Sequence, residues 1–105
     1  MDTIYRIRYI STFYTDVADV AAYLDEYPLK AKRIFAKIDA ILTNLPKMPE
    51  MYPVYDDFPI FRKIVIEDYL VFYTVDMQSK TIEIHRLLYG GMDMQKVLAE
   101  NNSTK

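Results

Sequence analysis

Residues 61–89, FRKIVIEDYLVFYTVDMQSKTIEIHRLLY, decide the fold of this 105-residue chain. The stretch contains three runs rich in β-branched and aromatic residues, which are separated by two short polar segments. Such runs predict β-strands, and connections this short join neighbouring strands antiparallel. Residues 70–72 are apolar at successive positions, so both faces of the middle strand should be covered. We therefore expect an antiparallel meander with strands at 61–66, 69–76 and 81–89.

Upstream of the meander, the spacing of apolar residues changes to that of helices. Residues 11–27 carry one apolar stripe at three- and four-residue intervals, and Ser11 or Thr12 can cap its N-terminus. Pro28 ends this first helix and suits the first turn of a second, over residues 28–45, because its missing N–H costs nothing there. Two helices joined so closely must fold back on each other as an antiparallel hairpin.

The flanking segments complete the fold. Residues 5–10 are rich in β-formers and alternate in part, which predicts a strand before the helices, and Asp93 can cap a short C-terminal helix. The predicted order is β-α-α-β-β-β(-α), an α+β fold whose helical hairpin covers one face of a four-stranded, mainly antiparallel sheet. We expect one domain over residues 1–100 and a frayed polar tail over 101–105.

The composition excludes several kinds of site. The chain has no Cys and one His, which removes disulfides, thiol nucleophiles and multi-histidine metal sites and leaves only a carboxylate-rich metal site open. We expect no metal and no cofactor. With 15 acidic against 13 basic residues, it has no global charge that favours direct DNA binding. The most apolar run, 69–75, is far shorter than the ~20 residues of a membrane span, and the N-terminus does not resemble a signal peptide. These features predict a soluble cytoplasmic protein with no membrane contact.

The order of elements, together with particular residues, resembles the RelE/ParE superfamily of toxins from bacterial type II toxin–antitoxin systems. The resemblance spans nearly the whole chain and is clearest in 62–66, in 69–76 and in 82–93, IEIHRLLYGGMD. It implies a small growth-inhibiting protein of the plasmid-stabilisation kind, kept inactive by a cognate antitoxin. RelE-like members enter the ribosomal A site and cut messenger RNA, whereas ParE-like members poison DNA gyrase without being nucleases.

The sequence departs from the nuclease branch at several positions. Tyr89, Gly91 and Met92 stand where the closing segment of the family often has a His and two basic residues, and Leu70 stands where nucleases commonly have an Arg. These differences and the acidic pI favour a ParE-like toxin that binds an essential target, with DNA gyrase as the candidate. A ribosome-dependent endoribonuclease, and a degenerate member that only binds an antitoxin, stay open as alternatives, so whether the protein is an enzyme stays open too.

RNA cleavage without a metal needs a base, clustered cations and an acid. The candidates are Arg62 and Arg86 for holding phosphate, and His85 and Tyr89 for moving a proton. Strict alternation places His85 and Tyr89 on one face of their strand and Arg86 on the other, so these residues cannot all converge without a bulge.

A structural role for Arg86 is the competing interpretation. An Arg in a strand otherwise made of Ile and Leu needs a partner if it is buried, and Asp76 or Glu83 is the expected carboxylate.

Candidate contacts for the antitoxin lie in two places. The first helix carries four acidic residues and no basic one, while the second is basic through residues that include Lys30, Arg33 and Lys37. These charges indicate either solvated helix faces with mild mutual attraction or a docking surface on the second helix. The Pro-rich segment 46–60 should be an extended loop against the body of the domain. Its residues Tyr52 and Tyr55, with Met92 downstream, are further candidate contacts.

Overall fold

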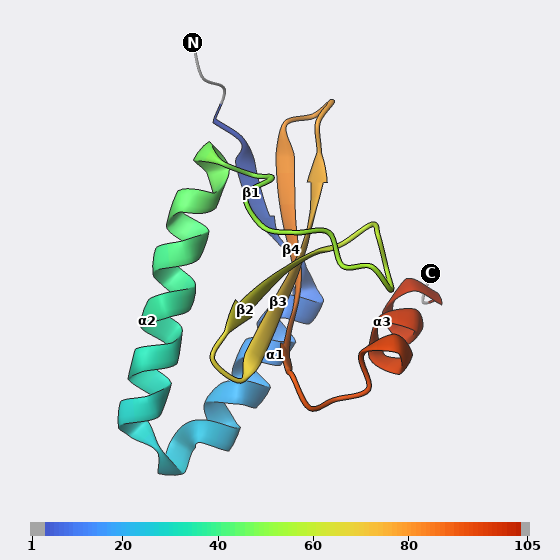
Figure 1. Cartoon of the computed structure of the whole chain (residues 1–105). Coiled ribbons are helices and arrows are strands. Elements are labelled where there is room, and N and C mark those ends of the chain that lie inside the picture. The colour runs from blue at the N-terminus through green and yellow to red at the C-terminus, as the bar shows by residue number, and fades with distance from the viewer. Residues whose placement is uncertain (1–3, 104–105) are drawn as a thin grey trace.

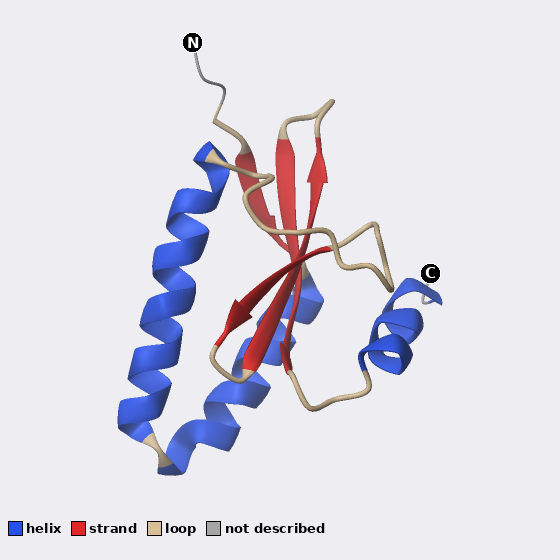
Figure 2. Cartoon of the chain, viewed as in Figure 1, coloured by secondary structure: helices blue, strands red, loops and turns tan. Residues whose placement is uncertain are grey.

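The computed structural model describes residues 4–103 as one layered α+β domain (Figures 1 and 2). No helix within this range is long and apolar enough to cross a membrane. The elements in chain order are β1 (Arg6–Tyr9), α1 (Ser11–Tyr23), η1 (Leu24–Glu26), α2 (Pro28–Asn44), η2 (Leu45–Lys47), β2 (Arg62–Ile66), β3 (Tyr69–Asp76), β4 (Thr81–Tyr89) and α3 (Met94–Ser103), where η denotes a 3₁₀ turn.

The sheet has the strand order β1-β4-β3-β2. Strands β2, β3 and β4 form the predicted antiparallel meander, and β1 joins β4 in parallel, with Arg6 opposite Thr81. The mainly antiparallel, four-stranded α+β fold predicted from the sequence is therefore confirmed, and β3 is an internal strand as its continuous apolar run required.

Helices cover both faces of the sheet. The α1–α2 hairpin packs on one face over the larger core, which includes Ile34, Val71 and Ile84 with no exposed surface. Helix α3 packs on the other face and buries Met94 and Leu98 against Phe61, Phe72 and Leu88 (Figure 1). Strand β3 contributes to both cores because its successive side chains alternate between the two faces.

Two helix ends differ from the sequence prediction. Helix α1 has Ile10 at its N-cap and no capping side chain; Thr12 instead donates a hydrogen bond of 2.7 Å to the His85 carbonyl oxygen. The predicted cap is thus wrong, because the hydroxyl is used between elements. Asp93 does cap α3, accepting from the Lys96 N–H at 3.2 Å. This helix continues to Ser103, into the expected polar tail, and residues 104–105 lie outside the described range.

The segment 48–60 is an ordered loop along the β2 edge, in agreement with its composition. Tyr73 donates its hydroxyl to the Pro49 carbonyl oxygen at 2.8 Å, and burial raises the pKa of Tyr73 to about 12. The Lys63 N–H donates to the Pro53 oxygen at 3.0 Å, and Val54 forms a single bridge with Arg62. These contacts cover part of an otherwise free sheet edge.

Candidate functional site

The exposed edge of β4 is closed by side chains of α1. Strand β1 ends at Tyr9, so the second half of β4 pairs with β3 on one side and has no strand on the other. There the Asp16 carboxylate accepts the Leu87 N–H at 3.0 Å, and Thr12, one helical turn earlier, donates to the His85 carbonyl oxygen. Two polar side chains of a helix thus satisfy backbone groups that a neighbouring strand would otherwise pair.

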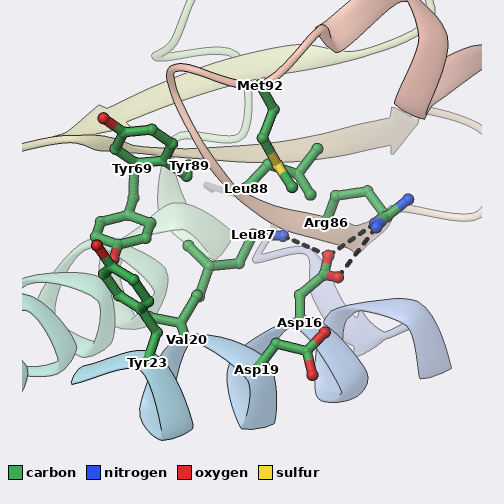
Figure 3. Close-up of a pocket in the computed structure, with 10 residues that line it drawn as sticks. All are labelled: Asp16, Asp19, Val20, Tyr23, Tyr69, Arg86, Leu87, Leu88, Tyr89 and Met92. Carbon is green, nitrogen blue, oxygen red and sulfur yellow. Dashed lines mark hydrogen bonds and ion pairs between the residues drawn. The ribbon is translucent and has the colours of Figure 1, made fainter. Parts of the chain in front are cut away.

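The same carboxylate holds Arg86 in a two-pronged ion pair. Arg86 Nε lies 2.7 Å from Asp16 Oδ2 and Nη2 lies 3.0 Å from Oδ1, with Asp16 only 6% exposed (Figure 3). The predicted partners, Asp76 and Glu83, are wrong. Asp76 accepts two backbone N–H groups of the β3–β4 turn, and Glu83 pairs with Arg8 at 2.9 Å.

A signal for Asp16 was present in the sequence. It lies three residues after Phe13 and four before Val20, which places it on the apolar stripe of the first helix. A carboxylate on a buried face needs a cation or several N–H donors, so this position pointed to a partner elsewhere in the chain.

A β-bulge resets the alternation of β4. Phe72 is opposite Arg86, whereas the next residue of β3, Tyr73, is opposite Ile84, so His85 is left without a partner. In consequence Ile84 and Leu87, three residues apart, both belong to the core under the helical hairpin. Strict alternation is therefore wrong beyond residue 84, because one extra residue shifts every later side chain to the other face.

His85 lies apart from the other candidates. Its ring packs edge-on against Phe61 with centroids 5.3 Å apart, and its Nε2 lies 3.2 Å from Thr74 Oγ1 and 3.7 Å from Glu83 Oε1. Burial lowers the pKa of His85, and the nearby Glu83 carboxylate opposes that shift only in part. The imidazole is therefore neutral at neutral pH.

A pocket of about 450 Å³ opens between α1 and the C-terminal end of β4. We call it the α1–β4 pocket. Figure 3 shows its tyrosines on one side and the Asp16–Arg86 pair on the other, with Leu87 between them. Of the candidate residues, it includes Arg86, Tyr89 and Met92. Its full lining is Asp16, Asp19, Val20, Tyr23, Tyr69, Arg86, Leu87, Leu88, Tyr89 and Met92.

Gly91 leaves room for the ring of Tyr89, which lines this pocket. A Cβ at this position would lie 2.5 Å from Cε2 of Tyr89, so only glycine lets the Tyr89 ring lie over the backbone. The ring also contacts Tyr69 edge-on, with centroids 6.1 Å apart. The absence of a side chain at Gly91 thus permits the observed position of the Tyr89 ring.

The other candidates lie outside the pocket and have structural contacts. Arg62 donates to the Tyr52 carbonyl oxygen at 2.7 Å and lies 3.3 Å from a Glu50 carboxylate oxygen, so it anchors the loop. The Tyr55 ring packs against Phe72 at 5.2 Å and lies 5.3 Å below the Lys63 ammonium.

The basic residues of α2 pair with the β2–β3 turn. Arg33 makes two 2.8 Å contacts with Glu67, Lys37 Nζ lies 2.9 Å from the same carboxylate, and Lys30 lies 3.4 Å from Asp68. The expected attraction to the acidic first helix is therefore wrong, since these cations project toward the sheet.

Within residues 4–103, no group of three or more potential ligands is placed to hold a metal ion.

Comparisons with known proteins agree with the fold. The toxin–antitoxin complex RelBE2 from Mycobacterium tuberculosis contains a chain that matches at a TM-score of 0.60 and 17% identity, over 83% of this chain and 92% of that one. No curated protein sequence matches. The family described as "ParE toxin of type II toxin-antitoxin system, parDE" matches residues 6–94. The chain therefore belongs to the ParE toxin family of type II toxin–antitoxin systems.

Proposed function

We propose that this toxin arrests growth by binding DNA gyrase, without cleaving RNA, and that a cognate antitoxin bound to its surface neutralises it. The observation that carries the proposal is the Asp16–Arg86 pair. A phosphate-binding Arg needs a free guanidinium, but here the carboxylate occupies its Nε and one terminal nitrogen and cancels its charge.

The other groups that RNA cleavage would need support the same conclusion. Arg62 donates to loop carbonyls, and His85 lies outside the α1–β4 pocket beside Phe61. A neutral imidazole with a lowered pKa is a poor general acid at neutral pH. Among the described residues, the pocket offers three tyrosine hydroxyls and the Asp19 carboxylate beside a neutralised Arg, and no free cation to stabilise the charge that develops, which is a weak set for phosphoryl transfer.

The exposed side chains of the α1–β4 pocket also support a toxin that acts by binding a protein target. Tyr23 is 72% exposed, Tyr89 54% and Met92 47%, and all three line the α1–β4 pocket. Tyrosine and methionine are favoured at protein interfaces because they offer large, adaptable contact areas. Gyrase acts in the cytoplasm, so the proposal places the toxin there too.

The test is to pulse-label DNA and protein synthesis within minutes of inducing the chain in a bacterial host without its antitoxin. The proposal predicts that DNA synthesis stops first while translation continues, and that the purified chain inhibits supercoiling by gyrase. An immediate stop in translation, with cleaved ribosome-bound messenger, would establish the ribonuclease instead. No effect on either would indicate the degenerate member.

A matched variant separates the two toxic mechanisms. His85→Gln can keep the contact of Nε2 with Thr74 through its amide but cannot exchange a proton. Growth arrest should persist in this variant if the toxin acts by binding. Loss of arrest in a stably folded His85→Gln chain would favour proton transfer and contradict the proposal.

A further inference from the structure

We propose that the α1–β4 pocket receives an arginine side chain from a partner protein of this toxin. The inference rests on the proposed function to the extent that the toxin works through protein partners. It names the chemistry of the contact, which the family membership does not specify.

The first argument is the aromatic wall. Tyr23 from α1, Tyr69 from β3 and Tyr89 from β4 line the same pocket, and Figure 3 shows their rings together on one side of it. The electron-rich faces of such rings attract cations, and the planar guanidinium of arginine stacks on them more readily than an ammonium does.

The second argument is charge. Asp16 and Arg86 neutralise each other on the side of the pocket opposite the tyrosines, which leaves Asp19 as the remaining charged group in the lining. Asp19 is exposed and has no ion-pair partner among residues 4–103. Residues 11–27 contain no basic side chain that could pair with Asp19. A cation therefore complements this surface, whereas an acidic side chain would be repelled.

The third argument is the apolar remainder of the lining. Val20, Leu88 and Met92 present hydrocarbon and a thioether to the pocket. An arginine side chain has three methylene groups behind its charged end, and these gain contact with apolar surface while the guanidinium reaches a carboxylate. Stacking, a two-pronged contact with Asp19 and burial of the methylene stem are thus available to one side chain together.

The experiment uses the purified full chain and the peptide acetyl-Leu-Arg-Leu-amide, with binding followed by NMR shifts of the Tyr89 and Met92 amides. A single anchoring side chain should bind with a roughly millimolar dissociation constant. The peptide with citrulline in place of arginine keeps the shape and loses the charge. It should bind about fivefold to tenfold more weakly, which is the effect of one partly exposed ion pair.

Matched variants locate the contact. Asp19→Asn should weaken binding of the arginine peptide about fivefold and leave the citrulline peptide unaffected, whereas Asp25→Asn, the same charge change outside the pocket, should change neither. Tyr23→Ala should weaken both peptides, while Tyr27→Ala, an exposed tyrosine outside the lining, should not. Because Asp19 and Tyr23 are exposed, these variants keep the fold.

Four results would overturn the inference. The first is equal binding of the arginine and citrulline peptides, which would make the pocket an apolar docking site. The second is an equal effect of Asp19→Asn and Asp25→Asn on binding of the arginine peptide. The third is the absence of NMR shifts at millimolar peptide. Dimerisation of the free chain that Asp19→Asn abolishes would also overturn it, since a second copy would then fill the pocket. None of these results affects the arrest of DNA synthesis, so this proposal and the proposed function can fail separately.

Discussion

At the scale of single residues, Asp16 joins α1 to the edge of β4, although it was not among the candidate residues named from the sequence. One carboxylate accepts two hydrogen bonds from Arg86 and one from the Leu87 N–H. It therefore holds α1 against the edge of β4 and neutralises the cation beside the α1–β4 pocket. A buried ion pair adds little net stability over apolar packing, but removing one partner leaves a buried charge without compensation.

Replacing Asp16 with Asn should lower the free energy of unfolding by about 3 kcal/mol, because Arg86 then lacks its counter-charge. Urea denaturation measures the change. Asp19→Asn, a neighbouring exposed Asp without an ion-pair partner in the described range, should stay within about 0.5 kcal/mol of the parent chain. A loss below about 1 kcal/mol for Asp16→Asn would contradict the structural role of the pair.

His85 should titrate below the ordinary histidine pKa of 6.5, because burial disfavours the imidazolium more than Glu83 favours it. The unfolded chain then binds a proton more readily than the native one, so stability falls as the pH drops through 6.5. NMR titration of the single His ring measures this pKa directly. A midpoint at or above 6.5 would refute it, and His85→Gln should remove this part of the pH dependence.

At the scale of elements, ion pairs join α2 to the turn between β2 and β3. Glu67 in that turn has φ 54°, a left-handed conformation that favours glycine, and its carboxylate contacts both Arg33 and Lys37. The ion pairs that this side chain makes with the helix offset part of the free-energy cost of the left-handed backbone conformation. These contacts explain why the basic residues of α2 face the sheet and not α1.

Acid should weaken the ion pairs between α2 and the β2–β3 turn. Hydrogen bonds from Arg33 and then Lys37 lower the pKa of Glu67 from 4.5 to about 2. Since the folded pKa is the lower one, the stabilisation is complete above pH 4.5 and is lost as the pH falls toward 2. Glu67→Gln should flatten the stability curve in this window, whereas Glu26→Gln should not. Parallel curves for Glu67→Gln and the parent chain would show that these ion pairs contribute nothing.

At the scale of the whole molecule, the first and last strands of the chain pair in the sheet. The β1 strand pairs in parallel with the first half of β4, with Ile7 opposite Ile82, and the start of α1 closes the second half. An edge that would otherwise be open along its length is covered by one strand and two helical side chains. Exposed sheet edges promote association between chains, and β1, an edge strand of four residues, leaves a shorter free edge than the nine residues of β4 would.

Removal of residues 1–10 should therefore make the chain aggregate. The truncated chain loses Tyr5 and Ile7 from the core and exposes the β4 edge at Ile82 and Ile84. We expect aggregation, measured by light scattering, and loss of cooperative thermal unfolding, measured by circular dichroism. A truncated chain that stays monomeric with an unchanged unfolding transition would show that β1 is dispensable.

The sequence by itself determined the elements and their order. Apolar periodicity located the strands and the helical hairpin, Pro28 stands at the start of α2, and Asp93 caps α3 as predicted. These features depend on residues within a few positions of one another, so local spacing is sufficient to predict them. The family resemblance, read from the same strands and from residues 82–93, is confirmed by the family match over residues 6–94.

Only the tertiary structure decided how the site is assembled. Asp16 and Arg86 lie 70 positions apart, and the bulge at His85 arises from pairing between two strands. Periodicity within one segment carries no information about either, because both depend on which element lies beside which. The α1–β4 pocket exists for the same physical reason, since its walls come from segments that meet only after the sheet and the helices have packed.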